Sequence, residues 1–78
     1  MPLTKEDIIK RINNDFVHHA PFGDQVARYA GLRECGRALA LAIVEETPIS
    51  REQSIALTHL ENAIFYANAA IARNEVQE

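Results

Sequence analysis

The stretch LTHLENAIFYANAAIA (residues 57–72) decides the fold of this chain. Its apolar residues recur at alternating intervals of three and four positions, in the order Leu57, Leu60, Ile64, Ala67 and Ile71. This spacing is typical of coiled-coil packing and predicts a long helix that turns one seam towards a partner helix. Ala63, Ala67 and Ala70 carry almost no side-chain bulk, so a partner helix can approach this one closely.

This helix is predicted over residues 50–74 and follows the short connection Thr47-Pro48-Ile49. A connection of this length returns the chain antiparallel to the preceding helix. Ser50 followed by Gln53 predicts a capping box at the start of the helix. Beyond Asn74 we expect the helix to fray into a polar tail.

A second long helix is predicted over residues 24–46, with Asp24 as its N-cap and Pro48 as its stop. Its apolar stripe comprises Tyr29, Leu32, Cys35/Gly36, Leu39 and Ala42/Ile43. Gly31 and Gly36 each cost about 1 kcal/mol relative to alanine inside a helix. Such glycines indicate either that another backbone or a ligand comes close, or that the chain merely tolerates them.

A short first helix is predicted over residues 4–14, because Thr4 and Asp7 form a capping pair and apolar residues then recur at helical spacing. Pro21 disfavours helix at the residue before it, so residues 16–23 are predicted to form an ordered turn or loop. The predicted fold class is therefore all-α, with a short N-terminal helix and a long antiparallel two-helix hairpin.

The chain has 78 residues and is predicted to form one domain, residues 1–78, whose lone hydrophobic core would be marginal. Small domains compensate with disulfides, a metal or self-association. The single cysteine, Cys35, excludes an internal disulfide and fits a reducing cytosol. Self-association is the remaining compensation, so we expect the hairpin to assemble as a homo-oligomer with ligand sites between copies.

The net charge is −3, with eight basic residues against eleven acidic ones. Proteins that bind nucleic acid polymers usually carry a basic stripe and a high isoelectric point. Extended DNA or RNA is therefore not an expected partner, whereas a compact anion held by a few arginines is compatible with this charge. No apolar stretch reaches about 18 residues, so we expect no membrane-spanning helix. The segment MPLTKEDIIK lacks the apolar core of a signal peptide.

The sequence does not show the residue groupings that catalysis needs. Cys35 falls on the predicted core face of its helix, where a thiol is inert. His18 and His19 are adjacent, so their side chains diverge, and His59 has no partner ligand at a spacing of three or four. We therefore expect no enzyme activity, no cofactor and no metal, and a function that rests on binding.

The loop His18-His19-Ala20-Pro21 and the pair Arg33 and Arg37 form a first polar constellation. The two arginines lie four positions apart, on one helix face with Gly36 between them. Their guanidinium groups offer forked donors for phosphate oxygens, and a loop imidazole can stack on a base. The alternative is that Arg33 pairs with acids such as Glu34, or Asp7 in trans, and merely solvates its face.

A second constellation follows the last predicted helix. Its members are His59, Asn62, Tyr66, Ala69/Ala70 and Arg73, with Thr58 at its edge. This stripe is either an exposed face or wet subunit interface, or it places an amide, a phenol and a guanidinium where symmetry copies converge on a second anion.

Several motifs in combination resemble one known family. They are Phe16-Val17-His18-His19-Ala20-Pro21, Gln25, Arg28-Tyr29, Leu32-Arg33, Ser50-Arg51-Glu52-Gln53-Ser54, Leu57-Thr58-His59-Leu60-Glu61 and Ala67-Asn68-Ala69-Ala70-Ile71-Ala72-Arg73-Asn74. Together they cover about residues 14–75, and they are similar to the small helical-hairpin domain of the phage anti-CBASS cyclic-nucleotide sponges. The anti-Thoeris sponges share this domain.

The resemblance implies a homohexamer that binds cyclic dinucleotides between protomers without cleaving them, in the cytoplasm of the infected bacterial host. Such binding helps a phage to evade CBASS-type defence. The register places His18 where the family stacks an aromatic residue on the bases, and Arg33, fifteen positions later, where it holds phosphate. His19, Pro21 and Arg37 complete this predicted site. His18 and Arg33 depart from the tyrosine and lysine expected of the family.

The resemblance also implies a second site, for cyclic trinucleotides, with Thr58, Asn68 and Arg73 as its residues. The anti-Thoeris relatives use an additional N-terminal β-domain for which this chain has no room. Sequestration of a cyclic ADP-ribose signal is therefore the alternative ligand assignment. An alternative of a different class is a helical protein–protein interaction module without a small ligand.

Overall fold

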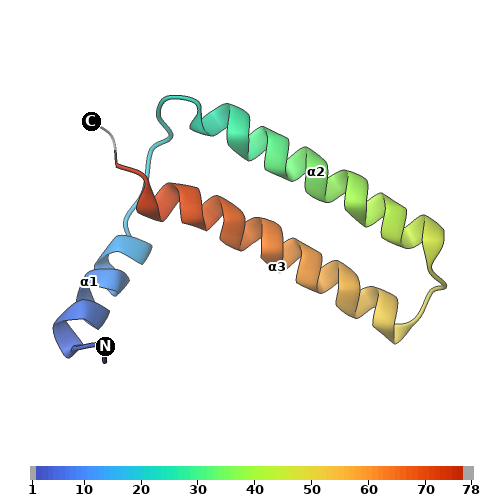
Figure 1. Cartoon of the computed structure of the whole chain (residues 1–78), viewed down its shortest axis with the longest axis horizontal. Helices are drawn as coiled ribbons and strands as arrows, with labels where there is room; N and C mark the ends of the chain where they lie inside the picture. Colours follow the sequence, from blue (N-terminus) through green and yellow to red (C-terminus); the bar gives the residue numbers. More distant parts are fainter. Residues whose placement is uncertain (1, 77–78) are drawn as a thin grey trace.

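The computed structural model describes residues 2–76 and contains three helices, α1 (Lys5–Asp15), α2 (Gln25–Glu46) and α3 (Arg51–Asn74). α2 and α3 lie side by side and antiparallel as a long hairpin, and α1 projects from its open end, beside the C-terminal end of α3 (Figure 1). No strand occurs in residues 2–76. The predicted all-α fold of a short helix and a hairpin is confirmed, and each helix begins one residue after its predicted start.

The predicted capping boxes of α1 and α3 differ in how completely they form. In α1, Thr4 Oγ1 accepts from the Asp7 N–H at 3.1 Å, and the Asp7 carboxylate accepts from the Thr4 N–H at 3.1 Å. In α3, Ser50 Oγ accepts from the Gln53 N–H at 3.1 Å. The Gln53 amide, however, donates to Thr47 O at 3.2 Å instead of returning to Ser50. The first box is therefore confirmed, and the second is only half formed.

The seam of the hairpin follows the prediction on α3 more closely than on α2. All five predicted seam residues of α3 are half-buried: Leu57, Leu60, Ile64, Ala67 and Ile71. On α2 the facing residues are Tyr29, Leu32, Gly36, Ala40 and Ile43. The prediction was wrong for Cys35, Leu39 and Ala42, which are exposed. A straight helix repeats every 3.6 residues, so the stripe drifts from position 39 to position 40 along α2.

Gly36 is the tightest point of this seam and lies buried beneath Ile64 of α3. A Cβ atom added to Gly36 would stand 2.7 Å from Ile64 Cγ1 and 3.0 Å from Ile64 Cδ1. The interpretation that a neighbour comes close therefore holds for Gly36. Gly31 has no atom within 4 Å of such a Cβ, so within one chain it faces open space.

One copy of the hairpin leaves much of its apolar surface in water. Among residues 2–76 no apolar side chain is fully buried, and Leu41, Val44 and Phe65 are each at least half exposed. The radius of gyration is 16.4 Å, whereas a compact domain of this length would have about 11–12 Å. The elongated pair of helices therefore has a seam but no closed core.

Gly31→Ala and Gly36→Ala are expected to change stability in opposite directions. Both remove the propensity cost of glycine, about 1 kcal/mol, but only the second forces a methyl group against Ile64. Gly31→Ala should raise the free energy of unfolding by up to about 1 kcal/mol, and Gly36→Ala should lower it by about 1–3 kcal/mol. Thermal unfolding followed by circular dichroism at one protein concentration measures both changes.

Combining Gly36→Ala with Ile64→Ala provides the control. Because Ile64→Ala makes room for the new methyl group, the two losses of stability should sum to more than the loss in the double variant. A Gly36→Ala protein as stable as Gly31→Ala would contradict the close packing.

Candidate functional site

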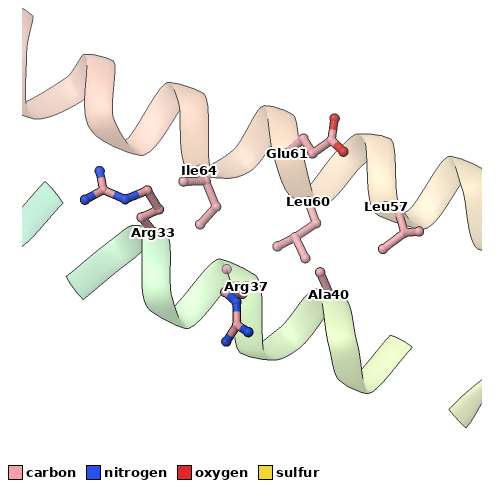
Figure 2. Close-up of a pocket in the computed structure, with 8 residues that line it drawn as sticks. Arg33, Arg37, Ala40, Leu57, Leu60, Glu61 and Ile64 are labelled. Carbon is pink, nitrogen blue, oxygen red and sulfur yellow. The ribbon is translucent and has the colours of Figure 1, made fainter. Parts of the chain in front are cut away.

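An apolar groove runs between α2 and α3 near the middle of the hairpin (Figure 2). It has a volume of about 330 Å³ and is lined by Arg33, Gly36, Arg37, Ala40, Leu57, Leu60, Glu61 and Ile64. Figure 2 shows the guanidinium groups of Arg33 and Arg37 directed away from each other. Within one chain, the two arginines of the first predicted site therefore border one groove without converging on one point.

Arg33 and Arg37 also differ in their partners. Arg37 Nη1 lies 3.4 Å from Glu34 Oε1, one turn away, and both side chains are about two-thirds exposed or more. Such a surface pair contributes little stability, so Arg37 can exchange it for another anion. Arg33 makes no hydrogen bond or ion pair with any residue that the structure describes. Within the chain Glu34 pairs with Arg37 and not with Arg33, whereas pairing of Arg33 with Asp7 of another copy stays a prediction.

A second groove lies nearer the open end of the hairpin, and we call it the polar groove. Its volume is about 420 Å³, and it is lined by His19, Tyr29, Arg33, Phe65, Asn68, Ala69, Ala72 and Arg73. His19 and Arg33 come from the first predicted site, whereas Asn68 and Arg73 come from the second. The structure thus brings parts of both predicted sites into one hollow, together with two aromatic rings that the sequence motifs did not assign to either.

The C-terminal turn of α1 fixes two walls of the polar groove. His19 Nε2 donates to Asn14 O at 2.9 Å, and Asn14 Nδ2 donates to Arg73 O at 2.9 Å. Asp15 Oδ1 lies 3.5 Å from Arg73 Nε. These contacts hold the imidazole and the guanidinium in place before any ligand arrives.

Asn68 presents an acceptor without a donor. Its Oδ1 atom is buried and has no hydrogen-bond partner among the described residues. Leaving such an acceptor unsatisfied costs about 1–3 kcal/mol.

The remaining predicted site residues lie apart from the polar groove within one chain. His18 lines a smaller cavity of about 250 Å³ with His19 and Glu75, and Pro21 is exposed on the same loop. Thr58 lines a separate surface hollow, ten positions before Asn68 and hence about 15 Å away along the helix. Thr58 can join Asn68 and Arg73 only through another copy of the chain.

A polar network at the open end of the hairpin, which we call the Glu75 network, was not predicted. Gln25 is only 2% exposed; its Oε1 accepts from the Phe22 N–H at 3.1 Å and its Nε2 donates to Glu75 Oε1 at 3.0 Å. Arg28 donates from Nη1 and Nη2 to the two oxygens of Glu75 at 2.6 and 2.5 Å. Arg28 Nε also donates to Asp24 at 3.0 Å. Asp24 therefore occupies the N-cap position without making the predicted capping bond.

The Glu75 network has a clear electrostatic signature. Hydrogen bonds from Arg28 and then from Gln25 lower the pKa of the Glu75 carboxyl to about 2, and the same pairing raises the pKa of Arg28. The helix ends at Asn74 as predicted, but the pairing of Glu75 with Gln25 and Arg28 was not predicted. Gln25 and Arg28 stand among the motifs that carry the family resemblance, but their roles depend on a partner far away in the chain.

The described residues offer no ready metal centre. Among residues 2–76 no group of three or more His, Cys, Asp or Glu side chains lies close enough together to hold a metal ion. Over the same range, no helix combines the length and the apolar character that crossing a membrane requires.

Comparison with known protein families gives one match. The family described as "Acb2/Tad1, hairpin domain" matches residues 7–72, which is most of the chain. The match includes all of α2 and leaves out only the first two residues of α1 and the last two of α3. No curated protein and no solved structure matches the chain significantly.

Glu75→Gln is expected to reduce the loss of thermal stability that the protein shows at low pH. The folded-state pKa of Glu75 is about 2 against an ordinary value of 4.5. Its pairing therefore stabilises the fold fully above about pH 4.5, and this stability is lost as the pH falls towards 2. Thermal midpoints measured from about pH 6 to pH 2.5 should fall more steeply for the wild type than for Glu75→Gln.

Glu45→Gln is the matched control, because Glu45 is an exposed carboxylate on α2 outside the network. The thermal midpoint of this variant should fall with decreasing pH as steeply as that of the wild type. An equally steep fall for Glu75→Gln and the wild type would rule out the assigned pairing.

Proposed function

The chain belongs to the Acb2/Tad1 hairpin-domain family of anti-CBASS and anti-Thoeris sponges, and we propose that it sequesters a cyclic di- or trinucleotide messenger of bacterial immunity without cleaving it. The observation that carries this proposal is the polar groove. There, Arg33 and Arg73 stand with His19 and Asn68 beside two aromatic rings.

The groups in the polar groove suit the parts of a nucleotide. Arginine offers forked donors that match phosphate oxygens, and Tyr29 and Phe65 offer flat faces on which a base can stack. Asn68 lines the same groove, and a side-chain amide can hydrogen-bond the edge of a base. The volume of about 420 Å³ falls in the range of small-molecule sites, roughly 300–1,000 Å³.

The symmetry of the ligand favours a site made by several copies. A cyclic dinucleotide repeats its base and phosphate twice, and a cyclic trinucleotide repeats them three times. One polar groove offers one such set of groups, so two or three copies related by symmetry would match the ligand. Thr58, His18 and Pro21, which lie outside the polar groove of their own chain, can contribute only in such an assembly.

The exposed apolar surface supports self-association. Side chains at least half exposed occur on α2 and α3 alike: Val26, Leu39, Leu41, Val44, Phe65 and Tyr66. A homohexamer of the kind implied by the resemblance would cover such surface, at about 25 cal/mol for each Å² of apolar area removed from water. Ala63 and Ala70 are exposed on α3 and would allow a neighbouring helix to come close.

Sequestration sets a demand on affinity. A sponge acts stoichiometrically, so it needs a nanomolar dissociation constant, about −12 kcal/mol. A few charge-assisted hydrogen bonds and stacked bases reach this value only when the site is ordered before binding. The hydrogen bonds that tie His19 and the carbonyl of Arg73 to Asn14 provide such order.

We expect Arg33→Ala to weaken ligand binding about 10- to 100-fold, because hydrogen bonds to a charged group contribute about 1.5–3 kcal/mol. Isothermal titration with a panel of cyclic di- and trinucleotides and cyclic ADP-ribose isomers measures this. Arg11→Ala is the control, because Arg11 is exposed on α1 and its substitution removes the same charge. The ligand should be recovered intact after denaturation.

Two results of this titration would count against the proposal. Binding no stronger than micromolar across the whole panel would remove the sponge function. Tight binding to cyclic ADP-ribose isomers alone would replace the ligand class with that of the anti-Thoeris alternative.

Light scattering is expected to give a mass near six times the 8.7 kDa of one chain. Ala70→Leu should reduce this mass, because the new side chain projects from an exposed position where a neighbouring helix would approach. The helix content of Ala70→Leu at low temperature should fall only slightly. A monomer or dimer at all concentrations would favour the protein-interaction alternative.

A further inference from the structure

We propose that Asp15 sets the anion affinity of the polar groove, because it neutralises Arg73, one of the two guanidinium groups in that groove. Asp15 Oδ1 lies 3.5 Å from Arg73 Nε, and the two side chains are 27% and 32% exposed. This inference rests on the proposed function only in that it takes the polar groove as the site where phosphate binds. Asp15 itself belongs to α1 and does not line the groove.

The position of Asp15 is held by its neighbours. Asn14 accepts a hydrogen bond from His19 and donates one to the carbonyl of Arg73. The last turn of α1 is thus tied to both walls of the polar groove. Among the described residues, the bond from Asn14 to the carbonyl of Arg73 is the only hydrogen bond between α1 and the hairpin. This bond keeps the carboxylate of Asp15 beside Arg73.

Arg33 and Arg73 therefore present different charges to a ligand. Arg33 has no acidic partner in the described part of the chain, so it meets an incoming phosphate with its full charge. Arg73 is already paired through Nε, and a phosphate that approaches its two remaining NH₂ groups meets the negative charge of Asp15 nearby. A ligand must displace the carboxylate or accept its repulsion.

This asymmetry determines how affinity depends on the charge of the ligand. An anion with one phosphate can bind at Arg33 alone and gains little when Asp15 is neutralised. An anion whose second phosphate extends to Arg73 gains more. The carboxylate of Asp15 thus lowers the affinity of the polar groove for multiply charged anions. Stacking and contacts with the bases then determine which ligand binds most tightly.

The opposite role is also testable. If Asp15 only positioned Arg73, removal of its charge would release the guanidinium and weaken binding. The two roles predict opposite signs for the same substitution.

The experiment compares Asp15→Asn with Glu6→Gln in the full chain. Both variants lose one negative charge from α1, but Glu6 is exposed and makes no side-chain contact with the groove. Isothermal titration with inorganic pyrophosphate and with cyclic di-AMP gives the affinities. We expect Asp15→Asn to bind both anions about fivefold more tightly than the wild type, because loss of an ion pair of about 1 kcal/mol corresponds to this factor. The affinities of Glu6→Gln should stay within about twofold of the wild-type values.

A double-mutant cycle and a spectrum complete the test. In an Arg73→Gln background, Asp15→Asn should give no gain in affinity. In the free protein, the Arg73 Nε–H resonance should shift in Asp15→Asn and not in Glu6→Gln. An unchanged resonance, or an equal or weaker affinity of Asp15→Asn, would overturn the inference.

The outcomes separate this inference from the proposed function. If cyclic di-AMP binds the wild type tightly but Asp15→Asn brings no gain, the inference fails and the sponge function stands. If no cyclic nucleotide binds but pyrophosphate binds Asp15→Asn more tightly than the wild type, the sponge function fails and the role of Asp15 stands. Absence of binding of every anion to every variant would overturn both.

Discussion

Two antiparallel helices can cover only one stripe of each other, and this geometric limit governs the whole chain. α2 and α3 have 22 and 24 residues, yet their shared seam leaves no apolar side chain of residues 2–76 fully buried. Burial of apolar surface is the main driving force of folding. The half-open seam therefore gives one copy of the hairpin less of this driving force than a closed core would.

The same limit explains why polar side chains can line the polar groove. A buried guanidinium or amide inside a small core would be costly, whereas a seam that stays half-open lets Arg33 and Asn68 stand beside apolar side chains without full desolvation. Ala69 and Ala72 leave the hollow between the helices unfilled. The Glu75 network and the end of α1 then order the open end of the hairpin. Packing with small residues makes the space, and polar contacts fix its walls.

The sequence predicts the local features of this fold well because helix periodicity and caps depend on neighbours three or four positions away. The three helices and the seam of α3 follow from such spacing. Residue-level errors arise where a local signal has a distant competitor. Asp24 has the right type and position for a cap, but Arg28 draws its carboxylate away while Arg28 itself binds Glu75, 47 positions along the chain. No spacing rule reveals a pair of that separation.

The candidate site likewise has features that local sequence predicts and features that depend on distant contacts. The sequence predicts Arg33, Asn68 and Arg73 as site residues, but their meeting in one groove depends on the register between α2 and α3, which periodicity alone does not fix. Tyr29 and Phe65 were missed as site residues because each carries an ordinary seam or surface signal. Both residues line the groove together with Ala69 and Ala72, whose small side chains leave space for the rings.

The two adjacent histidines illustrate how one distant contact selects a site residue. Adjacent side chains on a loop diverge, so only one imidazole can face the polar groove. Asn14 O accepts from His19, which lines both the polar groove and the smaller cavity beside it, whereas His18 lines only the smaller cavity. Within one chain the aromatic surface that lines the groove beside Arg33 therefore comes from Tyr29, Phe65 and His19, and His18 takes no part in it.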